Sequence, residues 1–126
     1  MAVANVSSFA ELKTAIEDAT STEIIVNGDI VFGDGAKINV AKSNVVIDFA
    51  GHTVTDSSNL SVSTTIYVPS TTNTISVTAK NAVWNGKNYY GVIGVYDGNT
   101  NTTINLENIS YTASICLQQK RHHKHS

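Results

Sequence analysis

The sequence is poor in the residues that would place it in several large classes of protein. Its 126 residues include one cysteine and one proline, and only 14% of them are charged. A single cysteine excludes an internal disulfide framework. No apolar run reaches the length of a transmembrane helix, and no basic segment followed by an apolar run marks a signal peptide. We therefore expect no membrane span, and either a cytoplasmic protein or a mature domain whose signal has been removed.

Basic residues are scarce in most of the chain. Residues 1–117 contain ten acidic and five basic residues, whereas residues 118–126 add three basic ones, for a formal net charge of −2. A mildly acidic body does not indicate nucleic-acid binding. The last segment is polar and unpatterned, and we expect a disordered tail. Three of its residues could bind transition metals, but we favour an incidental or tag-like tail and predict no metal site: His122, His123 and His125.

The chain is rich in β-branched and small polar residues. Isoleucine and valine together number 26 against four leucines, which favours strands over helices. A strand pattern, in three of its four copies led by asparagine, recurs along the sequence. Its inward aliphatic residues begin at Ile24, Ile47, Ile75 and Ile104, spaced by 23, 28 and 29 residues. Repeats of this size indicate a stacked or propeller-like architecture.

A second set of short strands keeps a similar period. Ile38–Val40, Ile66–Val68 and Ile93–Val95 begin 28 and 27 residues apart, and Ile115–Leu117 is a candidate fourth. Two strand families with one period are expected when a chain winds into coils, each of which adds one strand to each of several parallel sheets. Successive coils would stack about 4.8 Å apart. We therefore predict an all-β solenoid, a parallel β-helix of three to four coils.

One amphipathic helix is predicted before the coils, over residues 5–19. Ser8 and Glu11 fit a capping box, and Leu12 and Ile16 belong to an apolar stripe at helical spacing. The first coil of a solenoid exposes its apolar interior, so we expect this helix to cover it. A helix that binds a partner is the alternative.

These elements make one predicted domain, residues 1–117, followed by the tail, 118–126. At this length the chain is one domain at most. After the capping helix we expect coils at about residues 20–43, 44–72, 73–100 and 101–117.

Three segments resemble the start of pectate-lyase-like right-handed β-helices: 9–16 (FAELKTAI), 23–30 (EIIVNGDI) and 46–54 (VIDFAGHTV). The nearest variant is the adhesive type found in bacterial surface proteins. The resemblance extends over residues 6 to about 112. Full members run for more coils, so the chain resembles an N-terminal portion with an uncapped last coil. The resemblance implies an extracellular or cell-surface protein that attaches to surfaces or glycans, and several members are not enzymes.

The resemblance also directs attention to lyase chemistry. Pectate lyases use a basic residue, usually arginine, for proton abstraction, with calcium held by acidic side chains. The one arginine here is Arg121, in the tail, and Asp48 has Ser76 and Asn105 at the equivalent strand positions. One carboxylate beside hydroxyls and amides makes a poor calcium site. We predict no catalytic residue, cofactor or metal. The alternative is an N-terminal fragment of a polysaccharide lyase or hydrolase whose catalytic coils lie beyond residue 117.

The asparagines that lead the repeated strands, Asn44, Asn73 and Asn101, are interpreted as structural. Asparagine tolerates the left-handed conformation and bonds to nearby backbone. Stacked copies at one corner of the coil would form a ladder of side-chain amides that stabilises the fold. Ligand recognition is the alternative.

Four tyrosines are candidate contacts for a glycan or a protein. Tyr67 alternates outward in its strand, and Tyr96 follows the same sheet one coil later, with Tyr89 and Tyr90 in the neighbouring turn. Aromatic faces on a regular sheet can stack on sugar rings. The alternative is that these side chains only cover the sheet or pack under loops.

Together these features favour a non-catalytic surface or adhesion module that contacts glycans or a surface protein. The open C-terminal coil would leave strand edges unpaired and an apolar stack exposed, and such surfaces invite self-association.

Overall fold

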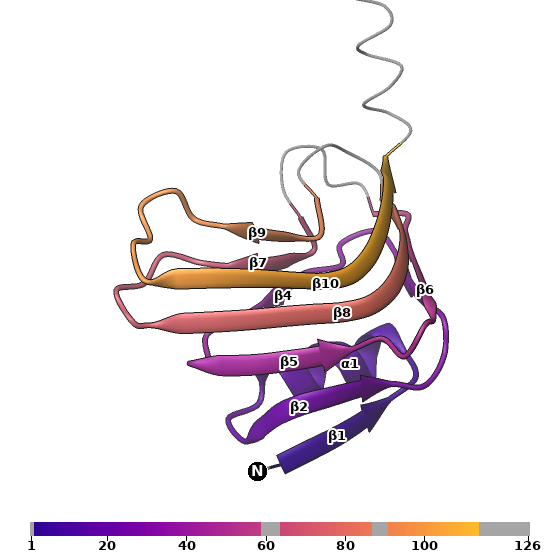
Figure 1. Ribbon diagram of the computed structural model, residues 1–126, viewed down its shortest axis with the longest axis horizontal. Coiled ribbons are helices and arrows are strands. Elements are labelled where there is room, and N and C mark those ends of the chain that lie inside the picture. The colour runs from indigo at the N-terminus through magenta and orange to yellow at the C-terminus, as the bar shows by residue number, and fades with distance from the viewer. Residues whose placement is uncertain (1, 59–63, 87–90, 114–126) are drawn as a thin grey trace, which may run out of the picture.

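The structure, a computed structural model, describes residues 2–58, 64–86 and 91–113. These residues form a parallel β-solenoid of about three turns (Figure 1). Every strand pairing among them is parallel. The predicted solenoid with one helix near the N-terminus is therefore confirmed, and an antiparallel sandwich is excluded.

The strands form a large sheet and a small sheet. The large sheet comprises β1 (Ala2–Val6), β2 (Ser21–Val26), β3 (Ile30–Phe32), β5 (Asn44–Asp48), β6 (Thr53–Asp56), β8 (Ile75–Gly86) and β10 (Thr102–Ala113). The small sheet comprises β4 (Ile38–Asn39), β7 (Ile66–Val68) and β9 (Ile93–Val95). The large sheet has the order β1-β2-β5-β8-β6-β3, with β10 also paired to β8, and the small sheet has the order β4-β7-β9. The two longest strands of the large sheet, β8 and β10, bend through a corner and so belong to both of its arms (Figure 1).

The small sheet has the predicted register. Ile38 pairs with Ile66, and Ile66 pairs with Ile93. All three side chains are buried, because alternate residues of each strand point into the coil. The candidate fourth strand, residues 115–117, lies outside the described residues.

The large sheet departs from the predicted register after its first coils. Ile24 pairs with Ile47 as predicted, but Ile47 pairs with Ala79 instead of Ile75. Ile104 is likewise displaced by two residues from its predicted partner. The predicted alignment of Ile75 with Ile47 is therefore wrong by four residues, and its predicted alignment with Ile104 is wrong by two. Both displacements are even, so the aliphatic side chains still face inward.

The helix α1 (Phe9–Glu17) is shorter than predicted at both ends. The Ser8 hydroxyl accepts a hydrogen bond from Glu11 N at 3.2 Å, and the Glu11 carboxylate accepts one from Ser7 N at 2.8 Å. This is the expected capping box, except that the Glu11 carboxylate accepts from the N–H of Ser7 instead of that of Ser8. The predicted helix start at residue 5 is wrong, because Asn5 belongs to β1, which pairs with β2.

The interior contains a chain of aromatic rings. The ring of Phe32 lies edge-on to those of Phe9 and Trp84, with centroids 5.5 and 5.7 Å away. Phe49 meets Trp84 in the same way at 5.4 Å. Edge-to-face pairs at these distances are favourable beyond the burial of their surface. Trp84 is thus a core residue, only 2% exposed, and links successive coils.

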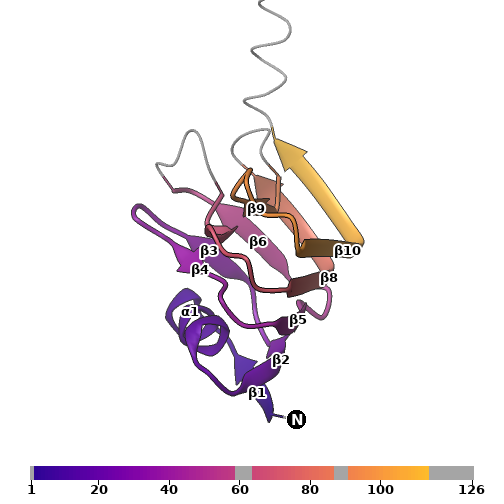
Figure 2. The same ribbon diagram turned by 90° about the vertical axis from the view of Figure 1, so that its left-hand side faces the viewer.

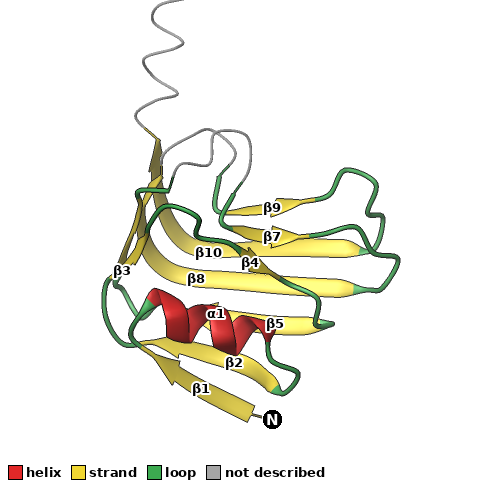
Figure 3. Ribbon diagram, turned by 180° about the vertical axis from the view of Figure 1, so that it is seen from behind, coloured by secondary structure: helices red, strands yellow, loops and turns green. Residues whose placement is uncertain are grey.

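The helix covers the edge of the small sheet at the N-terminal end of the stack. In Figures 2 and 3, α1 lies beneath β4 and against the inner side of β2. Lys13 Nζ donates to the Lys37 carbonyl at 2.7 Å, and Glu17 Oε2 accepts from Asn39 N at 3.0 Å. Lys13 and Glu17 also pair with each other at 2.9 Å. Side chains of the helix therefore satisfy backbone groups at the edge of β4 that no described strand pairs with.

Lys42 fastens the end of the helix to the first coil. Its ammonium donates to the Ala15 and Ser21 carbonyls and lies 3.4 Å from the Asp18 carboxylate. The Lys42 side chain is only 12% exposed. Charge-assisted bonds to the last carbonyls of a helix satisfy acceptors that the helix leaves open.

Candidate functional site

The two described candidate tyrosines lie on the outer face of the small sheet. Tyr67 is half-buried on β7 and pairs with Gly94 of β9. Tyr96 is 47% exposed and follows β9 directly. Tyr96 N donates to the Val68 carbonyl at 2.9 Å, so the ladder continues to this residue. Tyr96 lies two residues after Gly94, the partner of Tyr67 on the neighbouring strand. This spacing puts the Cα atoms of the two tyrosines roughly 8 Å apart.

The Tyr67 ring lies close to one residue of the coil before it and one of the coil after it. Lys37 Nζ lies 5.1 Å from the ring centroid, within the range of a cation–π contact. On the next coil, a Cβ atom at Gly94 would lie 3.1 Å from the ring and 2.6 Å from the Thr64 hydroxyl oxygen. Glycine at this position lets the ring lie over the neighbouring strand, as aromatic side chains commonly do beside a glycine of an edge strand.

The turn that carries Tyr96 is anchored to the coil below it. Asn99 Oδ1 accepts from Thr71 N at 3.0 Å, and Asn99 Nδ2 donates to the Pro69 carbonyl at 3.0 Å. A Cβ atom at Gly98 would lie 2.7 Å from the Tyr96 ring, so the turn packs closely against the ring. We call Lys37, Tyr67, Gly94 and Tyr96 together the tyrosine face. The other two candidates, Tyr89 and Tyr90, lie outside the described residues.

An amide ladder is present, but at a different corner from the one predicted. Asn81 Nδ2 donates to Asp48 Oδ1 at 3.0 Å, and Asn108 Nδ2 donates to Asn81 Oδ1 at 3.0 Å. Asn81 and Asn108 both have left-handed backbones, with φ of 62° and 55°. The hydrogen bond from Asn81 is the main cause of the lowered pKa of Asp48; partial burial opposes it, and the Ala50 N–H and the positive charge of Lys80 add to it.

The asparagines predicted to form the ladder have other partners. Asn44 pairs with Ser76, because the large sheet has the shifted register. Asn101 Nδ2 donates to the Thr72 carbonyl at 3.0 Å, and the Asn73 backbone N–H donates to the Thr71 hydroxyl. Within the described ranges, no hydrogen bond joins the side chains of these three asparagines. A ladder at Asn44, Asn73 and Asn101 is therefore incorrect, since the three residues do not stack.

The acidic residues are dispersed over the surface. The described part of the chain contains no group of three or more histidine, cysteine, aspartate or glutamate side chains that could hold a metal ion. Asp29 lies 3.5 Å from His52 Nδ1, and its carboxylate also accepts from Thr53 N at 2.9 Å. Backbone and hydroxyl hydrogen bonds from Ser21, followed by the Thr20 N–H, lower the pKa of Asp18 to about 2. Both carboxylates thus have structural partners.

Sequence reasoning missed Lys37 and Gly94 as parts of the tyrosine face. Gly94 belongs to a small-sheet column whose register was predictable, since Tyr67 pairs with Gly94 in the period already noted. Alignment of the short strands would have placed the glycine beside the ring. Lys37 lies just before β4 and reaches Tyr67 across one coil, which the strand pattern alone does not indicate.

The chain matches the family model of the pectate lyase-like adhesive domain over residues 3–117. The match covers almost all of the chain and agrees with the parallel solenoid. The chain belongs to the pectate lyase-like adhesive domain family. No curated protein and no solved structure matches it. Family membership suggests an adhesion-type module of a surface or extracellular protein. In the described residues, no helix has the length and apolar character needed to cross a membrane.

Proposed function

We propose that this adhesive domain acts at a cell surface or outside the cell, and that its tyrosine face contacts glycans. The observation that carries the proposal is the placement of Tyr67 and Tyr96 on one face of the small sheet, in adjacent coils. The family supplies the adhesion-type role, and the face supplies a surface with the chemistry for sugar rings.

We expect the tyrosine face to be largely preformed before a ligand binds. Lys37 and Gly94 lie close to the Tyr67 ring, and the Asn99 side chain hydrogen-bonds the turn that carries Tyr96 to the coil below. Rings that are already held lose little conformational freedom on binding, which favours affinity. Tyrosine also offers an apolar face with a polar tip, suited to a ligand that has both C–H surfaces and hydroxyl groups.

Glycan-array screening of the full chain, followed by titration of the best ligand, tests this proposal. We expect Tyr67→Ala and Tyr96→Ala each to weaken binding by about tenfold, because each removes one stacking ring. The matched variants Tyr67→Phe and Tyr96→Phe keep the ring and should retain most of the affinity. Unchanged binding in the double alanine variant, with an unchanged melting temperature, would exclude this face as the glycan site.

A further inference from the structure

The two ends of the stack carry complementary features. At the C-terminal end, β10 is paired only to β8 among the described strands, so its other edge is open. Leu106 points inward on this strand yet is 49% exposed, whereas Ala79, its partner one coil below, is fully buried. The open edge therefore combines unpaired backbone groups with a protruding leucine, which is a favourable surface for adding a strand.

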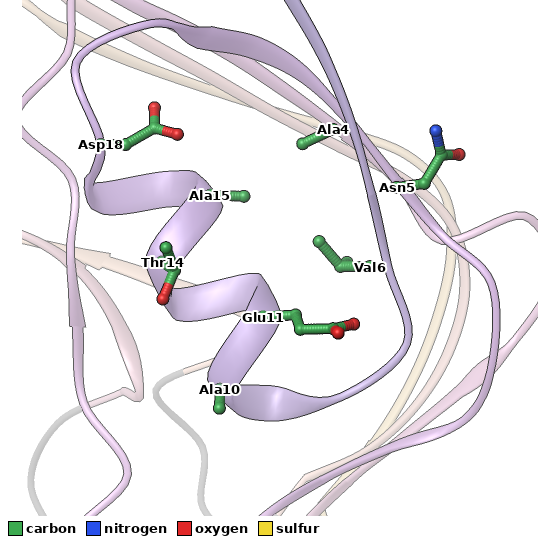
Figure 4. Close-up of a pocket in the computed structure, with 8 residues that line it drawn as sticks. All are labelled: Ala4, Asn5, Val6, Ala10, Glu11, Thr14, Ala15 and Asp18. Carbon is green, nitrogen blue, oxygen red and sulfur yellow. The ribbon is translucent and has the colours of Figure 1, made fainter.

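The N-terminal end has a groove between β1 and α1. The groove has a volume of about 390 Å³, and Figure 4 shows β1 on one side and the helix on the other. Its small apolar lining comes from Ala4, Val6, Ala10 and Ala15. Carboxylates of Glu11 and Asp18 stand at the groove. β1 pairs only with β2, so its outer edge is also open in the described part of the chain.

The open edges match in direction and in register. Ala4, Ile24, Ile47, Ala79 and Leu106 form one continuous column across five parallel strands. A second copy translated along the stack would therefore place its β1 parallel to β10, with its Ala4 above Leu106. The large side chain would meet a small one and enter the groove.

The neighbouring outward column is compatible with the same contact. Asn5, Ile25, Asp48, Lys80 and Glu107 are in register across the same strands. The second copy would bring the Asn5 amide next to the Glu107 carboxylate, a donor beside an acceptor. The five residues of β1 also fit the straight arm of β10 that precedes the corner at Asn108.

We infer that this domain associates head to tail with a second copy of itself, with β10 and Leu106 of one copy docking on β1 and the groove of the next. The contact uses a different patch on each partner, so it does not close on itself and generates a series of linear oligomers. This assembly is independent of the tyrosine face, which lies on the small sheet. It would repeat that face along the oligomer.

Sedimentation equilibrium of the full chain over a wide dilution series tests the inference. The average mass should rise with concentration beyond twice the 13.4 kDa of one copy. Leu106→Glu and Thr14→Arg should each remain monomeric, because the first places a charge on the docking leucine and the second fills the groove from an exposed helix position. Val83→Glu, at a 43% exposed position on the outer face of β8, is the matched control and should associate like the parent.

An equimolar mixture of the two monomeric variants gives the sharpest result. Each keeps one intact end, so the mixture should form pairs and nothing larger. A parent chain that stays monomeric at every concentration would overturn the inference. Association of Thr14→Arg alone, with no pairing in the mixture, would also overturn it and indicate that β10 pairs with β10. Melting curves of all variants would show that each is folded.

Discussion

The two ends of the solenoid differ in how their apolar side chains are covered. At the N-terminal end, Leu12 and Ile16 of α1 are completely buried against the first coil. At the C-terminal end, Leu106 on β10 is 49% exposed although it faces inward like its partners below. The difference shows that a coil cannot cover its own interior. A solenoid acquires a closed end only from an element outside the repeat.

The two ends also differ in how strand edges are treated. At the edge of β4 that no described strand pairs with, Lys13 and Glu17 of the helix bond to the backbone. Partial burial raises the pKa of Glu17, but the hydrogen bonds from Asn39 N and Lys13 together outweigh it and lower the pKa. Among the described residues, β10 has no such cover on its outer edge. The helix is therefore both an apolar lid and a polar substitute for a strand.

The largest predicted effect compares one leucine from each end. Leu12→Ala should lower the free energy of unfolding by about 3 kcal/mol, because it opens a cavity under the helix. Leu106→Ala should cost less than about 1 kcal/mol, because the side chain is half-exposed. Urea unfolding of both variants, at a concentration where the chain is monomeric, measures the difference. Equal losses would show that the C-terminal end is covered.

The ladder between the two ends should give the next largest effect. Asn81→Ala removes hydrogen bonds to Asp48 and Asn108 and places alanine in a left-handed backbone, so we expect a loss of about 2 kcal/mol. Asn73→Ala, at an exposed position, should change stability by less than about 0.5 kcal/mol. Thermal melts of both variants measure the difference. A larger loss of stability in Asn73→Ala than in Asn81→Ala would contradict this prediction.

The polar attachment of the helix should matter somewhat less. Lys42→Met keeps the length of the side chain but leaves the Ala15 and Ser21 carbonyls without their donor, which should cost about 1 to 1.5 kcal/mol. Lys80→Met, on the outer face of β8, is the control and should cost less than about 0.5 kcal/mol. A loss of stability at Lys42 no greater than that at Lys80 would show that the Lys42 ammonium does not stabilise the attachment of the helix.

The smallest effect is a pH dependence at the same attachment. The folded-state pKa of Asp18 is about 2, below its ordinary value of 3.8, because Ser21 and Thr20 donate to the carboxylate. A lowered pKa means that ionised Asp18 stabilises the fold above about pH 4, and that this contribution disappears as the pH falls toward about 2. Melting temperatures of the parent and Asp18→Asn should therefore converge over that range. A gap that stays constant would show that Asp18 does not titrate as described.

The sequence predicted the parts of the fold that depend on local patterns. The strands of the small sheet, each with an outward residue between two inward ones as in Ile66–Val68, follow from alternation and a regular period. The capping box of α1 follows from the hydroxyl of Ser8 and the carboxylate of Glu11, although the predicted start of the helix at residue 5 is wrong. β1 was missed because its short apolar residues leave no clear signal, and its strand character comes from pairing with β2.

The register and the ladder could not be predicted in the same way. Asn44, Asn73 and Asn101 begin similar phrases, but the pairing of the large sheet is fixed at its corner, where Asn81 and Asn108 adopt left-handed backbones. That conformation depends on where the strands bend. The sequence has 13 asparagines and does not indicate which of them lie at the bend. For the tyrosine face, the shared side of Tyr67 and Tyr96 was predictable from alternation and the place of Gly94 from the register, whereas the contact of Lys37 with Tyr67 required the packed structure.

Hydrogen exchange of individual backbone amides tests the contrast between the ends most directly. At a concentration where the chain is monomeric, amides of β5 and β8 should exchange slowest, those of β2 beneath the helix should be nearly as slow, and those of β10 should exchange fastest among the layers β2, β5, β8 and β10. This gradient would show that the helix closes one end while the other is open. Amides of β10 as slow as those of β5 would contradict the account.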